Sequence, residues 1–354
     1  MHAAHLSKIK IMLNIGPIPI ESSCILAPLA GVSDLPFRLI NRRFGCEFAF
    51  TEMVSARALI YENKTTLHKM LATEPLDRPL GIQLLGSNPD IIQKALDKLH
   101  AYQFDVIDFN AACPVAKVTN KGEGAHLLRE PKKLEALMKL LVRTTPVPVT
   151  LKIRSGWDTA SVNARDIALR AEDAGISALC IHGRTKDQGY QGVVDYAVIR
   201  TVKESLRIPV IASGDAISPL LIKKMFDETG CDGVAIARGA LGNPWIFRDT
   251  LAFLQSGTFV QRPAMNEIAD TMDSHLNLMV NFHGDLMGTL IFRKFFGWYC
   301  RGIHGIKELK TRAFCSKTRK QMIEIINEVR ERYWDPGMPN GVRCEMPISG
   351  YRVC

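Results

Sequence analysis

Several short apolar segments of this sequence end in residues that can react, carry charge or form hydrogen bonds. The most reactive is Cys113, three residues after Asn110, and others are Lys152, Arg154 and His182. With its ordinary pKa of about 8.5, a thiol is mostly protonated at neutral pH, so Cys113 is a candidate proton donor. A small packing residue is the alternative for any cysteine. Because buried polar groups are costly without partners, a set of them at successive segment ends favours a ligand site.

Lys152 and Arg154 are two residues apart on an expected strand, so both side chains point to the same side of it. Two cations at one place require an anion. A surface ion pair is one interpretation, although such pairs are weak signals. The other is a flavin, whose reduced N1 and O2 edge the lysine would stabilise while the arginine faces the substrate. His182 alone would fit a core histidine, but its neighbours favour a ligand contact.

The apolar segments alternate with longer amphipathic stretches, which is typical of parallel strands joined by helices. The eight expected strands are Cys24–Leu29, Phe48–Met53, Leu80–Leu85, Val106–Asn110, Val147–Ile153, Ala178–His182, Pro209–Ser213 and Gly233–Ala237. Eight strand-helix units in about 250 residues predict an α/β fold, an eight-stranded parallel (β/α) TIM barrel. An open doubly wound sheet is the rival, but the sequence has no G-x-x-x-x-G-K-[ST] and no G-x-G-x-x-G after the first strand.

In a TIM barrel the chemistry takes place at the carboxyl ends of the strands, and the last two loops commonly bind phosphate. Ser213, Gly214 and Asp215 lie at the end of the seventh expected strand, and Ala237 and Arg238 at the end of the eighth. Backbone amides and an arginine at two adjacent loops predict a site for a cofactor phosphate. Tight turns that merely need glycine are the alternative for either loop.

The chain of 354 residues exceeds one domain of average size, which is roughly 150 residues. We expect the barrel to occupy residues 1–255 and a small all-helical domain to occupy residues 256–354, with helices over 265–282, 291–302 and 316–333. Of the net charge of +9, the segment 293–320 carries +8, from nine basic residues and one acid. Such a basic face fits phosphate contacts on a nucleic acid, and a merely solvated charged face is the competing interpretation.

Other features of the sequence predict what the protein does not contain. Its nine cysteines are scattered and never spaced as C-x-x-C, so we predict neither a disulfide framework nor a zinc site. No stretch free of charged residues reaches the roughly 20 apolar residues that span a bilayer. Gly16, Pro17 and Pro19 interrupt the short apolar run near the N-terminus, which does not read as a signal peptide. We therefore expect a cytoplasmic protein with reduced thiols, no metal and no membrane partner.

Taken in order, the motifs of this sequence resemble those of the tRNA-dihydrouridine synthases, and most closely the bacterial B-type branch. The motifs are Ala27–Asp34, Thr51–Met53, Asn110–Pro114, Lys152–Trp157, His182–Thr185, Arg238–Ala240 and Pro244–Phe247. The resemblance runs from about Cys24 to Tyr333, and the ordered set is specific although each motif alone is weak. The sequence departs from the usual Met, Gly, Asn and Gly of the family at Leu29, Ala112, Ser213 and Ala237.

This resemblance implies an enzyme that reduces the C5–C6 double bond of a uridine in tRNA, with FMN as cofactor and NADPH as electron donor. Hydride would pass from flavin N5 to uracil C6, and Cys113 would protonate C5. The barrel would be the FMN-binding catalytic domain, and the helical domain would bind tRNA. Asn110 and Arg154 would bind the base, while Arg293 and Lys294 would contact the tRNA.

The resemblance also implies which residues bind FMN. Pro28, Leu29 and Ala30 would line the isoalloxazine, Gln83 and Lys152 would meet its polar edge, and His182 would contact the cofactor or the base. Ser213, Gly214, Asp215, Ala237 and Arg238 would hold the ribityl phosphate. Two alternatives remain open at this point: an FMN barrel oxidoreductase that acts on a small molecule, and a catalytically inactive barrel that binds RNA.

Overall fold

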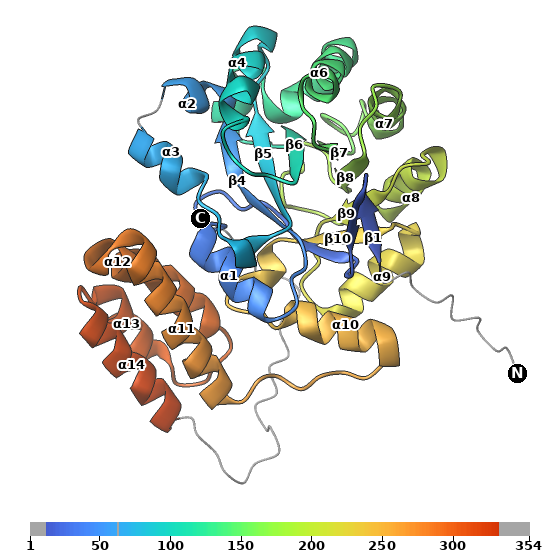
Figure 1. Ribbon diagram of the computed structural model, residues 1–354. Helices are drawn as coiled ribbons and strands as arrows, with labels where there is room; N and C mark the ends of the chain where they lie inside the picture. Colours follow the sequence, from blue (N-terminus) through green and yellow to red (C-terminus); the bar gives the residue numbers. More distant parts are fainter. Residues whose placement is uncertain (1–11, 62–63, 333–354) are drawn as a thin grey trace, which may run out of the picture. The chain divides into compact units, whose positions relative to one another are not determined.

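The computed structural model describes residues 12–61 and 64–332, and these form two compact units (Figure 1). The first unit extends to Gly239 and includes Ile246–Gly257, and the second consists of Ala240–Trp245 and the chain from Thr258 onward. A short segment after the last barrel strand therefore belongs to the second unit. The division of catalysis and tRNA binding between two domains stays a prediction.

The first unit is a closed barrel of eight parallel strands in the order β10-β3-β4-β5-β6-β7-β8-β9. The strands are β3 (Cys24–Leu26), β4 (Ala49–Ser55), β5 (Leu80–Leu85), β6 (Val106–Ala111), β7 (Val149–Arg154), β8 (Ala178–His182), β9 (Val210–Ser213) and β10 (Gly233–Ile236). Each overlaps one of the eight predicted strands, with ends that differ by up to three residues. The predicted TIM barrel is therefore confirmed, and the open sheet is excluded.

Helices surround the barrel strands in Figure 1. Those of the first unit are α1 (Leu35–Arg43), α2 (Ala56–Tyr61), α3 (Lys64–Met70), α4 (Pro89–Leu99), α5 (Ala116–Thr119), α6 (Pro131–Thr144), α7 (Ala164–Asp173), α8 (Tyr196–Ser205), α9 (Pro219–Thr229) and α10 (Ile246–Ser256). Three short 3-10 helices are η1 (Pro75–Asp77), η2 (Gly124–Arg129) and η3 (Arg238–Ala240). Local capping sets several starts: Asn88 accepts the Ile91 N–H ahead of α4, and Ser218 accepts the Leu221 N–H ahead of α9. In both helices proline occupies the first turn, where a missing amide costs nothing.

An antiparallel hairpin precedes the barrel, and the sequence did not predict it. Its strands are β1 (Leu13–Ile15) and β2 (Ile18–Ile20), joined by a turn in which Gly16 has φ of 58°. Leu13, Ile15 and Ile20 are almost fully buried and join the apolar core inside the barrel. The hairpin thus closes the amino-terminal end of the barrel and leaves the carboxyl end for polar residues.

The second unit contains four helices among the described residues, where three were predicted. They are α11 (Met265–His283), α12 (Asp285–Tyr299), α13 (Lys307–Cys315) and α14 (Arg319–Arg332). The prediction missed α13 because only Leu309 and Ala313 of that helix are buried, which leaves too weak an apolar period to recognise. The aromatic core was expected from the spacing on α12, and there Phe295 lies 4.5 Å from the ring of His275.

Within the described ranges, every helix is too short or too polar to cross a bilayer. The seven cysteines that the structure describes form no disulfide with one another, and Cys344 and Cys354 lie outside the described residues. Over the same residues, no group of three or more His, Cys, Asp or Glu side chains is placed to hold a metal ion.

Candidate active site at the carboxyl end of the barrel

The strand register brings the predicted polar residues together at one end of the barrel. Asn110 is level with Lys152, and Arg154 is level with His182, which in turn is level with Ser213. Asn110, His182 and Ser213 are each an even number of positions from a core residue on their own strand, so their side chains point into the barrel. Lys152 contacts Cys180 of that core, and Arg154, two positions further along β7, lies on the same side of the strand. Gln83, Asn110, Arg154, His182 and Ser213 are all buried there.

A buried chain of hydrogen bonds begins at Asn110 and runs inward across three strands. Asn110 Nδ2 donates to Gln83 Oε1 at 2.8 Å, and Gln83 Nε2 donates to Asp108 Oδ2 at 2.6 Å. Thr150 Oγ1 donates to the other oxygen of Asp108 at 2.6 Å. Burial raises the pKa of the Asp108 carboxyl, while the bonds from Thr150 and Gln83 lower it. The sequence missed Asp108, although it shares the inward face of β6 with Asn110.

Cys113 follows β6 and is held at the barrel end by backbone contacts. Asn110 Oδ1 accepts the N–H groups of Ala112 and Cys113 at 3.0 and 2.9 Å. The Cys113 carbonyl accepts the Ala125 N–H at 3.0 Å, and a Cβ at Gly124 would lie 2.8 Å from that carbonyl oxygen. Among the described non-glycine residues only Asp215 has a positive φ, so the backbone of Ala112 is not left-handed. The alanine at this position, where the family usually has glycine, is therefore not strained.

The Cys113 thiol is half-buried, unlike the fully buried Cys24 and Cys46. Burial raises its pKa, and a backbone hydrogen bond at Val115 and the charge of Arg154 lower it to a smaller extent. A thiol whose pKa is raised stays protonated through neutral pH. Its environment therefore suits a proton donor better than a thiolate nucleophile.

Arg154 is a buried connector between loops, with a side chain 2% exposed. Its Nε donates to the Ala112 carbonyl at 2.7 Å, next to Cys113, and its Nη1 donates to the carbonyls of Thr185 and Gly189. Burial lowers the pKa of its guanidinium to about 10. A surface ion pair at this position is thus excluded, because the side chain is buried and its partners in the described chain are carbonyls.

Among the cations of this site, Lys152 has the fewest recorded hydrogen-bond and ion-pair partners in the described chain. Its side chain is half-buried, and its Nζ lies 3.4 Å from Cys180 Sγ, its only recorded hydrogen-bond partner among the described residues. Burial raises the pKa of that thiol, and the neighbouring lysine opposes the increase. The charge of Lys152 also lowers the pKa of the buried Asp108 carboxyl, but no carboxylate of the described chain forms an ion pair with this half-buried ammonium, which favours the binding of an anion.

His182 lies among four cations and is neutral. Burial lowers its pKa well below the ordinary value, and the charges of Arg154, Lys152, Arg184 and Arg238 lower it further. Arg184 Nη1 lies 3.3 Å from His182 Nε2. The sequence missed Arg184 as a site residue, although it lies two positions after His182 in the same motif.

Asp215 is held between two arginines in the loop after β9. Arg184 forms a two-pronged contact with its carboxylate at 3.1 and 2.6 Å, and Arg238 Nη2 lies 3.0 Å from Oδ1. The backbone here is unusual, with φ of 118° at Gly214 and 52° at Asp215. A Cβ at Gly239 would lie 2.2 Å from the Ala216 carbonyl oxygen, so the loops after β9 and β10 approach each other closely. Ala237, just before Arg238, packs against the barrel core.

Tyr190, in the loop after β8, was not identified from the sequence. Its ring lies 5.6 Å from the guanidinium carbon of Arg154 and 5.1 Å from that of Arg238. The ring is also 6.4 Å from that of His182. The tyrosine is largely exposed, and it places an aromatic surface among these cations. No periodicity marks a residue in a loop of this kind, so its position came only from the structure.

Pro28, Leu29 and Ala30 form a turn after β3 that becomes more exposed toward Ala30. Ser33 Oγ accepts the Leu29 N–H at 2.8 Å and donates to the Leu29 carbonyl at 3.1 Å. Glu52, on the irregular part of β4, accepts the N–H of Gly31. Side chains from two directions therefore fix the backbone of this turn.

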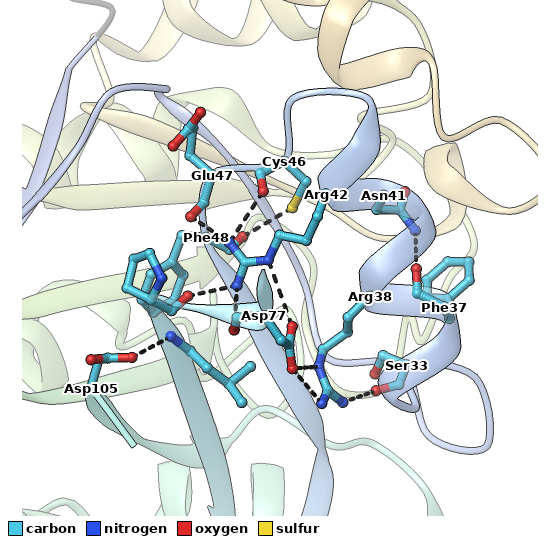
Figure 2. Close-up of polar contacts among 12 residues, drawn as sticks. Ser33, Phe37, Arg38, Asn41, Arg42, Cys46, Glu47, Phe48, Asp77 and Asp105 are labelled. Atoms are coloured by element: carbon cyan, nitrogen blue, oxygen red, sulfur yellow. Dashed lines mark hydrogen bonds and ion pairs between the residues drawn. The ribbon is translucent and has the colours of Figure 1, made fainter. Parts of the chain in front are cut away.

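Behind the turn lies a buried ion cluster, shown in Figure 2, which the sequence did not predict. Arg38 on α1 donates from Nε and Nη2 to Asp77 Oδ2 at 2.9 and 2.7 Å, and from Nη1 to the Ser33 carbonyl at 2.8 Å. Arg42 Nε lies 3.6 Å from Asp77 Oδ1. Asp77 is fully buried, so this one carboxylate joins two arginines of α1 to the segment before β5.

We expect replacement of Asp77 by asparagine to lower the free energy of unfolding by about 3–5 kcal/mol, because the buried guanidinium of Arg38 and the largely buried one of Arg42 lose their counterion. Urea denaturation of the purified protein measures this change. Asp105→Asn is the matched control: the pair of Asp105 with Arg78 is partly exposed, so its loss should cost about 1 kcal/mol or less. Equal effects of the two substitutions would contradict the importance of the buried cluster.

The two tail residues that the sequence assigned to tRNA lie in the second unit. The Arg293 guanidinium donates to the Ser316 carbonyl, at 2.8 Å from its Nε. The Lys294 ammonium lies 5.1 Å from the centre of the Phe295 ring. Arg293 therefore links α12 to the segment between α13 and α14. Its expected contact with tRNA stays a prediction.

The profile of the family described as dihydrouridine synthase (Dus) matches residues 25–332. A protein named tRNA-dihydrouridine synthase B from Xanthomonas campestris is 40% identical over 290 residues, which cover 82% of this chain and 87% of the relative. The protein of the same name from Pseudomonas aeruginosa is 35% identical over 89% of this chain and 97% of its own length. A probable tRNA-dihydrouridine synthase 1 from Synechocystis is 37% identical over 85% of this chain and 84% of its own.

Proposed function

Because the chain belongs to the dihydrouridine synthase family, we propose that it reduces the C5–C6 double bond of a uridine in tRNA to give 5,6-dihydrouridine. The names of its relatives supply the substrate class. The observation that carries the proposal in this chain is the position of Cys113, a half-buried thiol at the barrel end beside Arg154 and the polar chain that starts at Asn110. That arrangement suits the protonation of a carbon atom in a bound base.

We propose FMN as the cofactor, and the residues of the barrel end fit an anionic group of this kind. Lys152 forms no ion pair with a carboxylate in the described chain, and His182 is surrounded by cations. The loops that follow β9 and β10 approach each other closely at Ala216 and Gly239, and the loops after the last two strands of a TIM barrel frequently bind phosphate. Arg184 and Asp215 form an ion pair that would fix Arg238 toward the phosphate.

The remaining contacts with the cofactor are proposed from the same residues. The turn at Pro28, Leu29 and Ala30 is fixed by Ser33 and Glu52, so it presents an ordered surface to a flat ring. Gln83 uses one amide hydrogen on Asp108 and keeps a second for a ligand. Ala237 would lie beneath the cofactor, since a small side chain there leaves room for it.

When bound, the flavin supplies the hydride, and NADPH supplies the electrons that restore it. The chain's own residues handle the proton and the base. Cys113 would donate its thiol proton to C5 of the uracil. Asn110 has one amide hydrogen left for the base, and Arg154 holds the Ala112 carbonyl, so the segment before Cys113 is fixed while the proton moves. Hydrogen bonds directed at the uracil oxygens would stabilise the charge that develops there.

The uridine must leave its stack to reach the barrel end, at a cost of a few kcal/mol that contacts elsewhere on the tRNA offset. We assign those contacts to the helical unit, whose segment 293–320 carries most of the net positive charge. If the assignment is right, the helical unit would distinguish this chain from barrel oxidoreductases that act on small molecules.

The decisive experiment compares tRNA from cells with and without this protein. Mass analysis should find one or more positions that are dihydrouridine in the parent strain and uridine, lighter by two hydrogen atoms, in the deletion strain. The purified yellow protein with NADPH should convert these uridines to dihydrouridine. A transcript of the same tRNA without modifications serves as substrate, and heat-denatured protein is the control. Unchanged tRNA in the deletion strain would refute the function, and a colourless protein that cannot take up FMN would favour a catalytically inactive RNA-binding barrel.

A further inference from the structure

The basic segment 293–320 of the second unit contains two kinds of cation. Most of its arginines bind acceptors within the protein. Arg293 donates to the Ser316 carbonyl, and Arg319 donates to Asn277 Oδ1. Arg312 pairs with the carboxylates of Glu308 and Glu328. Two lysines of α13 differ, since neither Lys307 nor Lys310 has a hydrogen-bond or ion-pair partner for its ammonium group in the part of the chain that the structure describes. These lysines are therefore available to a ligand, which the arginines are not.

Both lysines line one hollow at the start of α13. Residues 302–307, Lys310, Thr311 and Phe314 line an open surface hollow of about 630 Å³, a volume that is within the range of small-ligand sites. Lys310 is half-buried, and burial lowers the pKa of its ammonium. Gly302 and Gly305, with φ of 75° and 71°, form the loop that opens the hollow. Phe314 lines the hollow from the same face of α13 as the two lysines: half of its surface is exposed, and a Cβ at Gly297 of α12 would lie 3.2 Å from its ring.

We propose that this hollow binds one nucleotide of the substrate tRNA, with Lys307 and Lys310 on its phosphate and the Phe314 ring against its base. The inference rests on the proposed function and extends it to a defined contact in the helical unit. The hollow combines unpaired cations with an exposed aromatic face, and this pairing of charge and stacking is how proteins bind single-stranded nucleotides. An acidic peptide would use the lysines but would leave the aromatic wall without a role.

The test measures binding of an unmodified tRNA transcript by fluorescence anisotropy at several salt concentrations. Lys307→Gln and Lys310→Gln should each weaken binding about fivefold and lower the salt dependence by about one phosphate contact. Phe314→Leu should weaken binding about tenfold with an unchanged salt dependence, because a stacking surface is lost and no charge changes. Phe314→Tyr keeps the ring and should bind within about twofold of the unaltered protein.

Lys320→Gln is the matched control, since it removes one charge from the same basic segment but lies outside the hollow. Its effect should be smaller than that of Lys307→Gln, and the unfolding midpoints of all variants show whether the fold is intact. If all three lysine substitutions weakened tRNA binding equally and Phe314→Leu did not weaken it, the proposed site would be overturned, and the basic segment would bind tRNA by non-specific electrostatic attraction. Unchanged binding in every variant while tRNA is still reduced would overturn the site alone. Absence of tRNA binding by the unaltered protein would overturn the proposed function as well.

Discussion

Replacement of Cys113 by alanine is expected to lower the rate of dihydrouridine formation by about 10²- to 10⁴-fold, the usual contribution of a positioned acid. Binding of FMN and tRNA should persist, because Asn110 contacts the Cys113 N–H and Arg154 contacts the Ala112 carbonyl, and neither bond involves the thiol. Single-turnover reduction of a tRNA transcript by the reduced protein measures the chemical step. Cys231→Ala is the control, since that thiol is buried at the other end of the barrel, before β10.

The pH dependence provides a second test of the same acid. Burial raises the pKa of the Cys113 thiol, so the proton-donating form should predominate through neutral pH. The rate should stay level there and decrease only when the pH rises through the raised pKa, because the thiolate has no proton to give. Full activity in Cys113→Ala, or a rate that increases with pH in that range, would contradict the assignment of this residue as the acid.

The barrel could be predicted from the sequence because its strands are buried on both faces. Such strands are continuous apolar runs, and β5 and β6 illustrate this with every residue buried. The polar residues at the ends of these runs are conspicuous for the same reason. Their side-chain directions follow from the alternation along a strand, so Lys152 and Arg154 were correctly expected on one side of β7.

Partnerships with backbone atoms could not be predicted from the sequence. Arg154 was expected to face the substrate, yet the acceptors of its hydrogen bonds are the carbonyls of Ala112, Thr185 and Gly189, which any residue type would offer. The bond of Arg293 to the Ser316 carbonyl has the same character. Main-chain acceptors leave no mark on the sequence, so a cation that holds loops together looks the same as one that binds a ligand.

The missed hairpin has a different cause. Its strands of three residues each are too short for an alternating pattern to stand out, and Gly16, Pro17 and Pro19 interrupt them. Its burial depends on the barrel that it closes, because Leu13, Ile15 and Ile20 meet core residues distant in the sequence. Local patterns report local structure, and this element is stabilised by long-range packing.

The second large effect is expected at Lys152. Its replacement by methionine keeps the shape of the aliphatic stem but removes the charge, so the affinity for FMN should decrease by about 10- to 100-fold, in line with ~1.5–3 kcal/mol for a hydrogen bond to a charged group. The protein without flavin should be as stable as before or more stable, because a half-buried ammonium whose recorded partner is a thiol costs free energy. Flavin fluorescence titration and urea denaturation measure the two quantities.

Lys203→Met is the matched control and should show the opposite pattern. Lys203 Nζ pairs with Asp232 Oδ2 at 2.6 Å, and its loss leaves that carboxylate without its cation at the other end of the barrel. Stability should therefore decrease by about 1 kcal/mol while flavin affinity is retained. A ligand-binding lysine loses affinity without losing stability, and a structural lysine does the reverse. If Lys152→Met destabilised the flavin-free protein and bound FMN normally, Lys152 would be structural and the anion site would have to lie elsewhere.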